Sequence, residues 1–123
     1  DPSISNPQSI TSGPDGALWF TNKGNDSIGR ITTAGAITNF SGGGMDDPFS
    51  ITAGSDGALW FTNAFTTHAI GRITTAGVVS LLTSPDIGRP KQIVGGPDGA
   101  LWFGNEGNQG SIGRITTAGA ITF

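Results

Sequence analysis

Apolar residues along this chain form short runs that are separated by polar turns at regular intervals. The first four runs read "QSITS", "ALWFTN", "SIGRIT" and "AITNF", at 8–12, 17–22, 27–32 and 36–40. Runs of this length, rich in Ile, Phe, Trp and Thr and bounded by Gly, Pro, Asp or Asn, predict β-strands. The run "ALWF" does not alternate with polar residues, which indicates a strand that is covered on both faces. Because no apolar stripe of period 3.6 is present, helices are not expected.

The segments between the runs have the composition of tight turns. The first reads "GPDG" at 13–16, and the third reads "TTAG" at 32–35. Proline presets the φ angle that a turn needs at its second position, and glycine adopts the positive φ that other residues avoid. Four runs joined by such hairpins predict an antiparallel meander.

The whole set of four runs occurs three times. The stretch "GPDGALWFTN" at 13–22 returns as "GSDGALWFTN" at 54–63 and as "GPDGALWFGN" at 96–105. Trp19, Trp60 and Trp102 are therefore 41 and 42 residues apart. A period near 42 is typical of four-stranded propeller blades, whereas a β-sandwich does not repeat its sequence at this spacing. The sequence predicts an all-β propeller segment with three four-stranded antiparallel blades in one domain, at approximately 7–41, 48–83 and 90–123.

Three blades do not close a ring. An open stack leaves two apolar faces in water, and closed propellers have about 4–8 blades. The multiple of three in that range is six. We therefore predict that two chains associate head to tail with C2 symmetry, so that the expected partner is a second copy of this chain.

Composition and charge exclude several classes of function. The 123 residues carry a net charge of −3 with no basic block, which argues against a nucleic-acid partner. No run approaches 18 apolar residues, so no membrane helix is predicted. Cysteine is absent, which removes disulfides, zinc thiolates and a cysteine nucleophile. The first residues show no signal-peptide pattern, as in a processed or engineered chain, and the sequence does not identify a compartment.

The loops that vary between repeats fall at one end of the predicted meanders. These are the second-to-third loops and the links between blades, and they carry nearly all of the charges that are not repeated. Irregular polar loops on a rigid scaffold are where binding usually resides, although loops also vary because they are less constrained. The candidate residues for a ligand face at the channel mouth are Gln8, Asn22, Phe49, Asn63, His68, Lys91, Asn105 and Glu106.

The repeated polar residues favour a structural role. Asp15 recurs as Asp56 and Asp98 in the first turn, where aspartate accepts hydrogen bonds from turn amides. Arg30, which also recurs in all three repeats, is expected to brace a turn or a contact between blades, and the repeated tryptophans to form the core.

Candidate chemistry outside the repeats is sparse. His68 is the single histidine, and no "GxSxG" elbow supplies a nucleophile for it. Asp46 and Asp47 lack the alternating oxygen ligands of a calcium loop, so no metal site is predicted.

The repeat "ITSGPDGALWFTN…IGRITTAGAIT" resembles that of the virginiamycin B lyase (streptogramin lyase) family of β-propellers. It is more distantly similar to NHL and gluconolactonase-type propellers. The resemblance covers nearly the whole chain. It implies a propeller of the seven-bladed kind and a Mg²⁺-assisted elimination that opens the ester of a cyclic depsipeptide antibiotic.

The catalytic residues that the resemblance implies are not matched. The family's histidine follows Pro in a "PHGIT"-like segment, and its glutamate closes a "WFTE"-like segment fourteen residues later. The matching pairs in this chain are Gln8 with Asn22, Phe49 with Asn63, and Lys91 with Asn105. Ester elimination needs a base and an acid or metal, and glutamine, phenylalanine and asparagine cannot transfer the protons.

The prediction is therefore a non-catalytic propeller module that assembles into a ring, with no catalytic residue and no cofactor. Two alternatives remain open. In the first, the chain is a streptogramin B lyase that uses Mg²⁺, and it would open the ring of a streptogramin B at a rate above background. Otherwise it is a sugar-binding lectin, suggested by Phe49 and Phe65 on the loop face and testable on a glycan array.

Overall fold

The chain folds into three separate antiparallel sheets of four strands each, in a computed structural model that describes residues 2–107 and 110–123. Each sheet keeps the order of its strands along the chain, as the meander pattern predicts. The strands of the first sheet are β1 (Pro7–Ser12), β2 (Leu18–Asn22), β3 (Ser27–Ile31) and β4 (Ile37–Ser41). Those of the second are β5 (Pro48–Ala53), β6 (Leu59–Asn63), β7 (Ala69–Ile73) and β8 (Val79–Leu82). Those of the third are β9 (Pro90–Gly95), β10 (Leu101–Asn105), β11 (Ser111–Ile115) and β12 (Ile121–Thr122).

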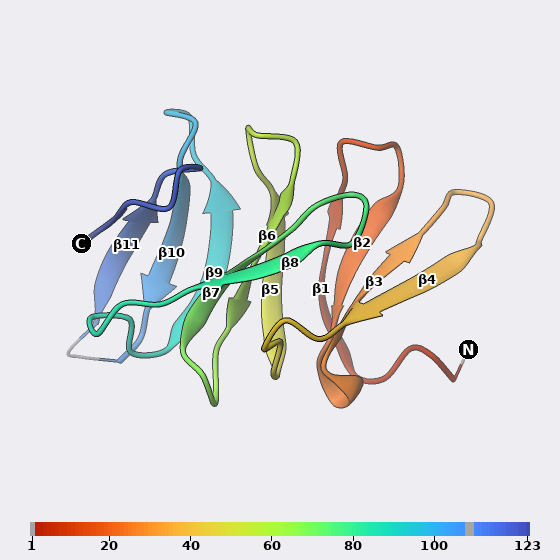
Figure 1. Cartoon of the computed structure of the whole chain (residues 1–123), viewed down its shortest axis with the longest axis horizontal. Coiled ribbons are helices and arrows are strands. Elements are labelled where there is room, and N and C mark those ends of the chain that lie inside the picture. The colour runs from red at the N-terminus through yellow and green to blue at the C-terminus, as the bar shows by residue number, and fades with distance from the viewer. Residues whose placement is uncertain (1, 108–109) are drawn as a thin grey trace.

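The three sheets stand next to one another as blades, which confirms the predicted all-β fold (Figure 1). The short helix η1 (Lys23–Asn25) lies in the loop between β2 and β3. The β1–β2, β5–β6 and β9–β10 turns lie at the upper end in Figure 1, and η1 and the β6–β7 loop lie at the lower end. The nearly invariant turns and the variable loops therefore occupy opposite ends of the blades. Within the described residues, no helix has the length and apolarity to cross a membrane.

Each blade has two different apolar faces. In the first blade Thr11 pairs with Trp19, and Ile10 pairs with Phe20 on the opposite face. We call these the Trp face and the Phe face; they carry Trp19, Trp60 and Trp102, and Phe20, Phe61 and Phe103, respectively.

The hydrophobic core lies between the blades. One buried cluster joins Trp19 and Ile28 of the first blade to Leu59 and Phe61 of the second. A second cluster joins Trp60 of the second blade to Phe103 of the third. The Trp faces of the first and second blades therefore pack against the Phe face of the following blade, which explains why "ALWF" does not alternate with polar residues.

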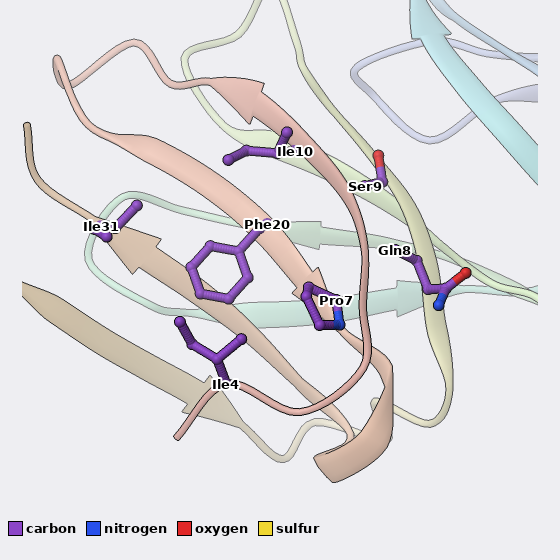
Figure 2. A pocket seen from close by; sticks show the side chains of 7 residues that line it. All are labelled: Ile4, Pro7, Gln8, Ser9, Ile10, Phe20 and Ile31. Carbon is purple, nitrogen blue, oxygen red and sulfur yellow. The ribbon is translucent and has the colours of Figure 1, made fainter. Parts of the chain in front are cut away.

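Two faces have no blade against them, one at each end of the stack. The Phe face of the first blade leaves Ile10 with 62% of its surface exposed, and the Trp face of the third blade leaves Ile112 equally exposed. A cavity of about 400 Å³ lies on the first of these faces. Figure 2 shows Ile4, Pro7 and Ile31 around Phe20. The predicted open ends of the stack are thus present and apolar.

The repeated aspartate, tryptophan and arginine form one brace inside each blade. Asp15 Oδ1 accepts hydrogen bonds from Trp19 Nε1 at 3.0 Å and from the Ala17 amide at 3.2 Å. Asp15 Oδ2 accepts a hydrogen bond from Arg30 Nε at 2.7 Å. The predicted bond to a turn amide is confirmed. The arginine, which we expected to brace a turn or a contact between blades, braces the first turn of its own blade from β3. The same three bonds occur around Asp56 and Asp98.

The brace lowers the pKa of its carboxylates. Burial acts to raise the pKa of Asp15, but hydrogen bonds from Arg30, Trp19 and the turn amide outweigh it and lower the pKa from 3.8 to about 2. At Asp98 the hydrogen bond from the Trp102 indole contributes most, and its pKa is also about 2.

Stability is therefore expected to fall as the pH is lowered from about 4 to about 2. The unfolded chain binds a proton at Asp15 near pH 3.8 and the folded chain only near pH 2, so acid favours unfolding across this interval. For Asp15 the loss is on the order of 1 kcal/mol after solvent screening. Urea unfolding at several pH values measures it. The Asp15→Asn variant is expected to be less stable at pH 6 but to show a shallower decline in acid, and an unchanged slope would contradict the assignment.

Candidate functional site

The variable loops bring a group of charged and aromatic side chains together at one end of the blades. Phe49 at the start of β5 and Phe65 in the β6–β7 loop meet edge to face, with ring centroids 5.8 Å apart. Lys91 in β9 places its ammonium 4.6 Å from the Phe49 ring centroid and 4.9 Å from that of Phe65. Lys23 in η1 lies 4.5 Å from the Phe65 ring centroid. We call Lys23, Phe49, Phe65 and Lys91 the lysine–phenylalanine cluster; all three blades contribute to it.

An ion-pair network borders this cluster. Lys91 Nζ lies 3.9 Å from Glu106 Oε2, and Arg89 Nη1 lies 3.3 Å from Glu106 Oε1. Glu106 is 56% exposed, so the pairs are in contact with solvent and contribute little to stability. Of the predicted ligand-face residues, the structure therefore gathers Phe49, Lys91 and Glu106.

His68 and Glu106 line a second hollow, a polar cavity of about 510 Å³ that also includes Arg89, Gly88 and Pro85. His68 has a φ of 47°, in the left-handed region, and is half-buried. The third blade's loop continues through Asn108 and Gln109, which belong to the predicted variable face but lie outside the described residues.

Gln8 lies apart from the other candidates. Its side chain is exposed, donates a hydrogen bond to Asn6 Oδ1 at 2.8 Å, and borders the cavity on the open Phe face of the first blade (Figure 2). Gln8 occupies the repeat position of Phe49 and Lys91, but no blade stands in front of it.

The three strand-end asparagines are buried and hold the backbone that approaches each blade. Asn63 has no exposed surface; its oxygen accepts a hydrogen bond from the Asp46 amide at 3.3 Å, and its nitrogen donates to the Gly44 carbonyl at 3.1 Å. Asn105 likewise accepts from the Gly88 amide and donates to the Asp86 carbonyl, each at 2.8 Å. Asn22 does the same with the Ser5 amide and the Ser3 carbonyl. The ends of these side chains are therefore occupied within the chain.

The positions that correspond to a metal-assisted lyase do not fit a metal ion in this chain. Mg²⁺ prefers carboxylate and other hard oxygen ligands together with water. The matching positions offer the buried, hydrogen-bonded carboxamides of Asn22, Asn63 and Asn105.

Three carboxylates converge elsewhere on the loop end. The side chains of Asp26, Asp46 and Asp47 place one oxygen each within 4.8 Å of one another. One oxygen of Asp26 accepts a hydrogen bond from the Asp47 amide at 2.9 Å, so part of the arrangement ties the first link to the β2–β3 loop. Acidic groups at a surface commonly gather in this way without an ion, and the cluster by itself establishes no metal site.

The chain resembles solved lyase structures over almost its entire length. It is 45% identical to a catalytically inactive variant of virginiamycin B lyase from Staphylococcus aureus, solved with quinupristin. The TM-score is 0.89, and the match covers 96% of this chain and 40% of that one. A streptogramin B lyase structure matches with 43% identity and a TM-score of 0.86, over 96% of this chain and 40% of that one. The chain thus spans two fifths of the length of these enzymes.

More distant structures share the fold alone. A nidogen/laminin complex matches with 17% identity and a TM-score of 0.82, over 97% of this chain and 48% of that one. A comparison with curated proteins finds no match. The model of the virginiamycin B lyase family matches residues 1–123. Together with the lyase structures, this match places all three blades in one family, and the chain therefore belongs to the virginiamycin B lyase family.

Proposed function

We propose that the chain is a non-catalytic propeller module in which two copies associate head to tail and close a ring of six blades. The observation that carries the proposal is that each open face repeats a face that is buried elsewhere in the same molecule. Ile10, Phe20 and Ile31 occupy the positions at which Ile51, Phe61 and Ile73 are buried in the second blade.

The other open face supplies the complement. Trp102 and Ile112 of the third blade occupy the positions at which Trp60 and Ile70 are buried against the next blade. The Trp face of a second copy can therefore pack on the open Phe face of the first copy, and its Phe face on the open Trp face. Neighbouring blades inside the chain pack in the same way. Head-to-tail association of two copies forms two identical junctions, which buries both open faces.

The expected mass in solution is that of a dimer, 25 kDa from two chains of 12.5 kDa. Sedimentation velocity over a range of concentrations measures it. Ile112→Lys places a charge on the open Trp face and is expected to give a monomer. Val78→Lys is the matched control, because Val78 is 65% exposed but lies in the β7–β8 turn, away from both open faces. A wild-type chain that remains near 12.5 kDa at all concentrations contradicts the proposal.

The ligand site of such a module is the lysine–phenylalanine cluster. Three ammonium–ring contacts already surround Phe49 and Phe65, and Lys91 is held by Glu106. The positive charges of Lys23 and Lys91 favour an anionic ligand over the neutral sugar of the lectin alternative.

The competing proposal is that the chain acts as a streptogramin B lyase. It is favoured by the 45% identity to a virginiamycin B lyase. Against it stand Gln8, Phe49 and Lys91 at the position of the implied catalytic base. Ring opening of a streptogramin B with Mg²⁺ by the purified chain distinguishes the two proposals.

A further inference from the structure

Two hydroxyl groups clamp the first blade to the second. Thr21 Oγ1 donates a hydrogen bond to the Phe49 carbonyl at 3.0 Å. Ser9 Oγ accepts a hydrogen bond from the Ile51 amide at 3.2 Å. Both partners are backbone groups of β5, the first strand of the next blade. Thr21 Oγ1 also accepts a hydrogen bond from the Ser9 amide at 3.0 Å, which holds the two clamping side chains together.

The second junction repeats this clamp. Thr62 Oγ1 donates to the Lys91 carbonyl at 2.8 Å, and Ser50 Oγ accepts from the Ile93 amide at 3.1 Å. At both junctions a hydroxyl from the second strand contacts a carbonyl, and a hydroxyl from the first strand contacts the amide two residues later. The clamp is therefore part of how one blade holds the next.

The third blade carries different residues at both clamp positions. Gln92 precedes Ile93 as Ser50 precedes Ile51, and Gly104 follows Phe103 as Thr62 follows Phe61. Gln92 is exposed, and a Cβ atom built on Gly104 would have no neighbour within 4 Å. The Trp face that would meet the next copy thus lacks both hydroxyls and has space beside the glutamine.

One carboxamide can replace the two hydroxyls. In an extended strand the carbonyl of one residue and the amide of the residue two positions later point to the same edge. A glutamine side chain has a donor nitrogen and an acceptor oxygen, so it can bond both groups at once. The corresponding backbone groups on the first blade are the Gln8 carbonyl and the Ile10 amide, since β1 and β5 have the same register with β2 and β6.

We infer that Gln92 closes the junction between two copies by pairing with the Gln8 carbonyl and the Ile10 amide of the second copy, in space left by Gly104. This inference rests on the proposed ring. The partner is a second copy of this chain, and Gln92 is the side chain that holds it. C2 symmetry forms the contact twice, so the dimer contains four such hydrogen bonds.

The test compares dimer dissociation constants for three chains by sedimentation. Gln92→Met keeps the length of the side chain but removes both hydrogen-bonding groups, and it is expected to weaken the dimer about 100-fold or more, since four hydrogen bonds are lost. The double variant Gln92→Ser, Gly104→Thr recreates the internal clamp and is expected to stay within about tenfold of the wild type. Gln92 is exposed in the single chain, so circular dichroism of dilute samples is expected to show that all three fold alike.

Amide hydrogen exchange supplies a readout at the contact itself. The Ile10 amide is expected to be protected in the wild-type dimer and to exchange faster in Gln92→Met. If the wild type dimerises and Gln92→Met dimerises equally tightly with Ile10 still protected, the inference about Gln92 is wrong while the ring proposal stands. If the wild type does not dimerise, both are wrong, and the open faces are covered by something other than a second copy.

Discussion

Replacing Gly71 by alanine is expected to lower the free energy of unfolding by about 3 kcal/mol, the upper range for overpacking a core. Gly71 in β7 lies directly opposite Phe61 in β6, and a Cβ atom at this position would lie 2.1 Å from Phe61 Cζ. The Phe61 ring has no exposed surface and packs in the core between the first two blades. Because the ring is enclosed on all sides, the added methyl group forces the blades apart or the ring out of its rotamer.

Gly29→Ala is the matched control for this substitution. Gly29 lies opposite Phe20 in the same register, and its Cβ atom would also lie 2.1 Å from the ring. Phe20 borders the open cavity on the first blade, so its ring can tilt into that space (Figure 2). We expect a loss of about 1 kcal/mol, at the low end for overpacking.

The comparison is made by urea unfolding at concentrations below those at which copies associate. Equal losses for the two variants would show that confinement by the neighbouring blade does not set the cost at Gly71. At higher concentration the difference is expected to shrink, because a second copy would enclose Phe20 as the first blade encloses Phe61.

The repeat made the fold predictable from the sequence. A strand signal in a single run is ambiguous, but the same four runs and the same turn residues at a spacing near 42 restrict the choice to one architecture. The non-alternating "ALWF" also indicated correctly that the second blade is covered on both faces. The direction in which Arg30 reaches could not be predicted, because the turn and the neighbouring blade are both within range of its long side chain.

The site was less predictable, for a physical reason that the asparagines illustrate. Asn22, Asn63 and Asn105 end a strand where variable loops begin, and a polar residue at such a place suggests exposure. The links that precede each blade fold over these side chains and bury them, a long-range contact that local sequence does not encode. The available signal was their identity in all three repeats, the same signal that assigned Asp15 and Arg30 to structure.

The burial of Asn63 leads to a strong prediction for its replacement by leucine. The side chains have the same branched arrangement of heavy atoms, but leucine leaves the Asp46 amide, the Gly44 carbonyl and Thr67 Oγ1 without the carboxamide that bonds them. A hydrogen bond contributes about 0.5–1.5 kcal/mol net, so we expect the loss of three in Asn63→Leu to lower the free energy of unfolding by about 3 kcal/mol. Urea unfolding measures the loss.

Thr67→Val separates the contributions, because it removes only the hydroxyl partner at 2.8 Å and is expected to cost about 1 kcal/mol. A loss no larger than this for Asn63→Leu would mean that the carboxamide does not hold the link. Asn63→Glu, which introduces the acid that the lyase resemblance implies at a strand end, removes the donor to the Gly44 carbonyl and adds a methylene group where no surface is exposed. It is expected to destabilise the chain and not to create an acid that faces the channel. The side chain at this position is buried against the backbone of Gly44 and Asp46, where a ligand has no access.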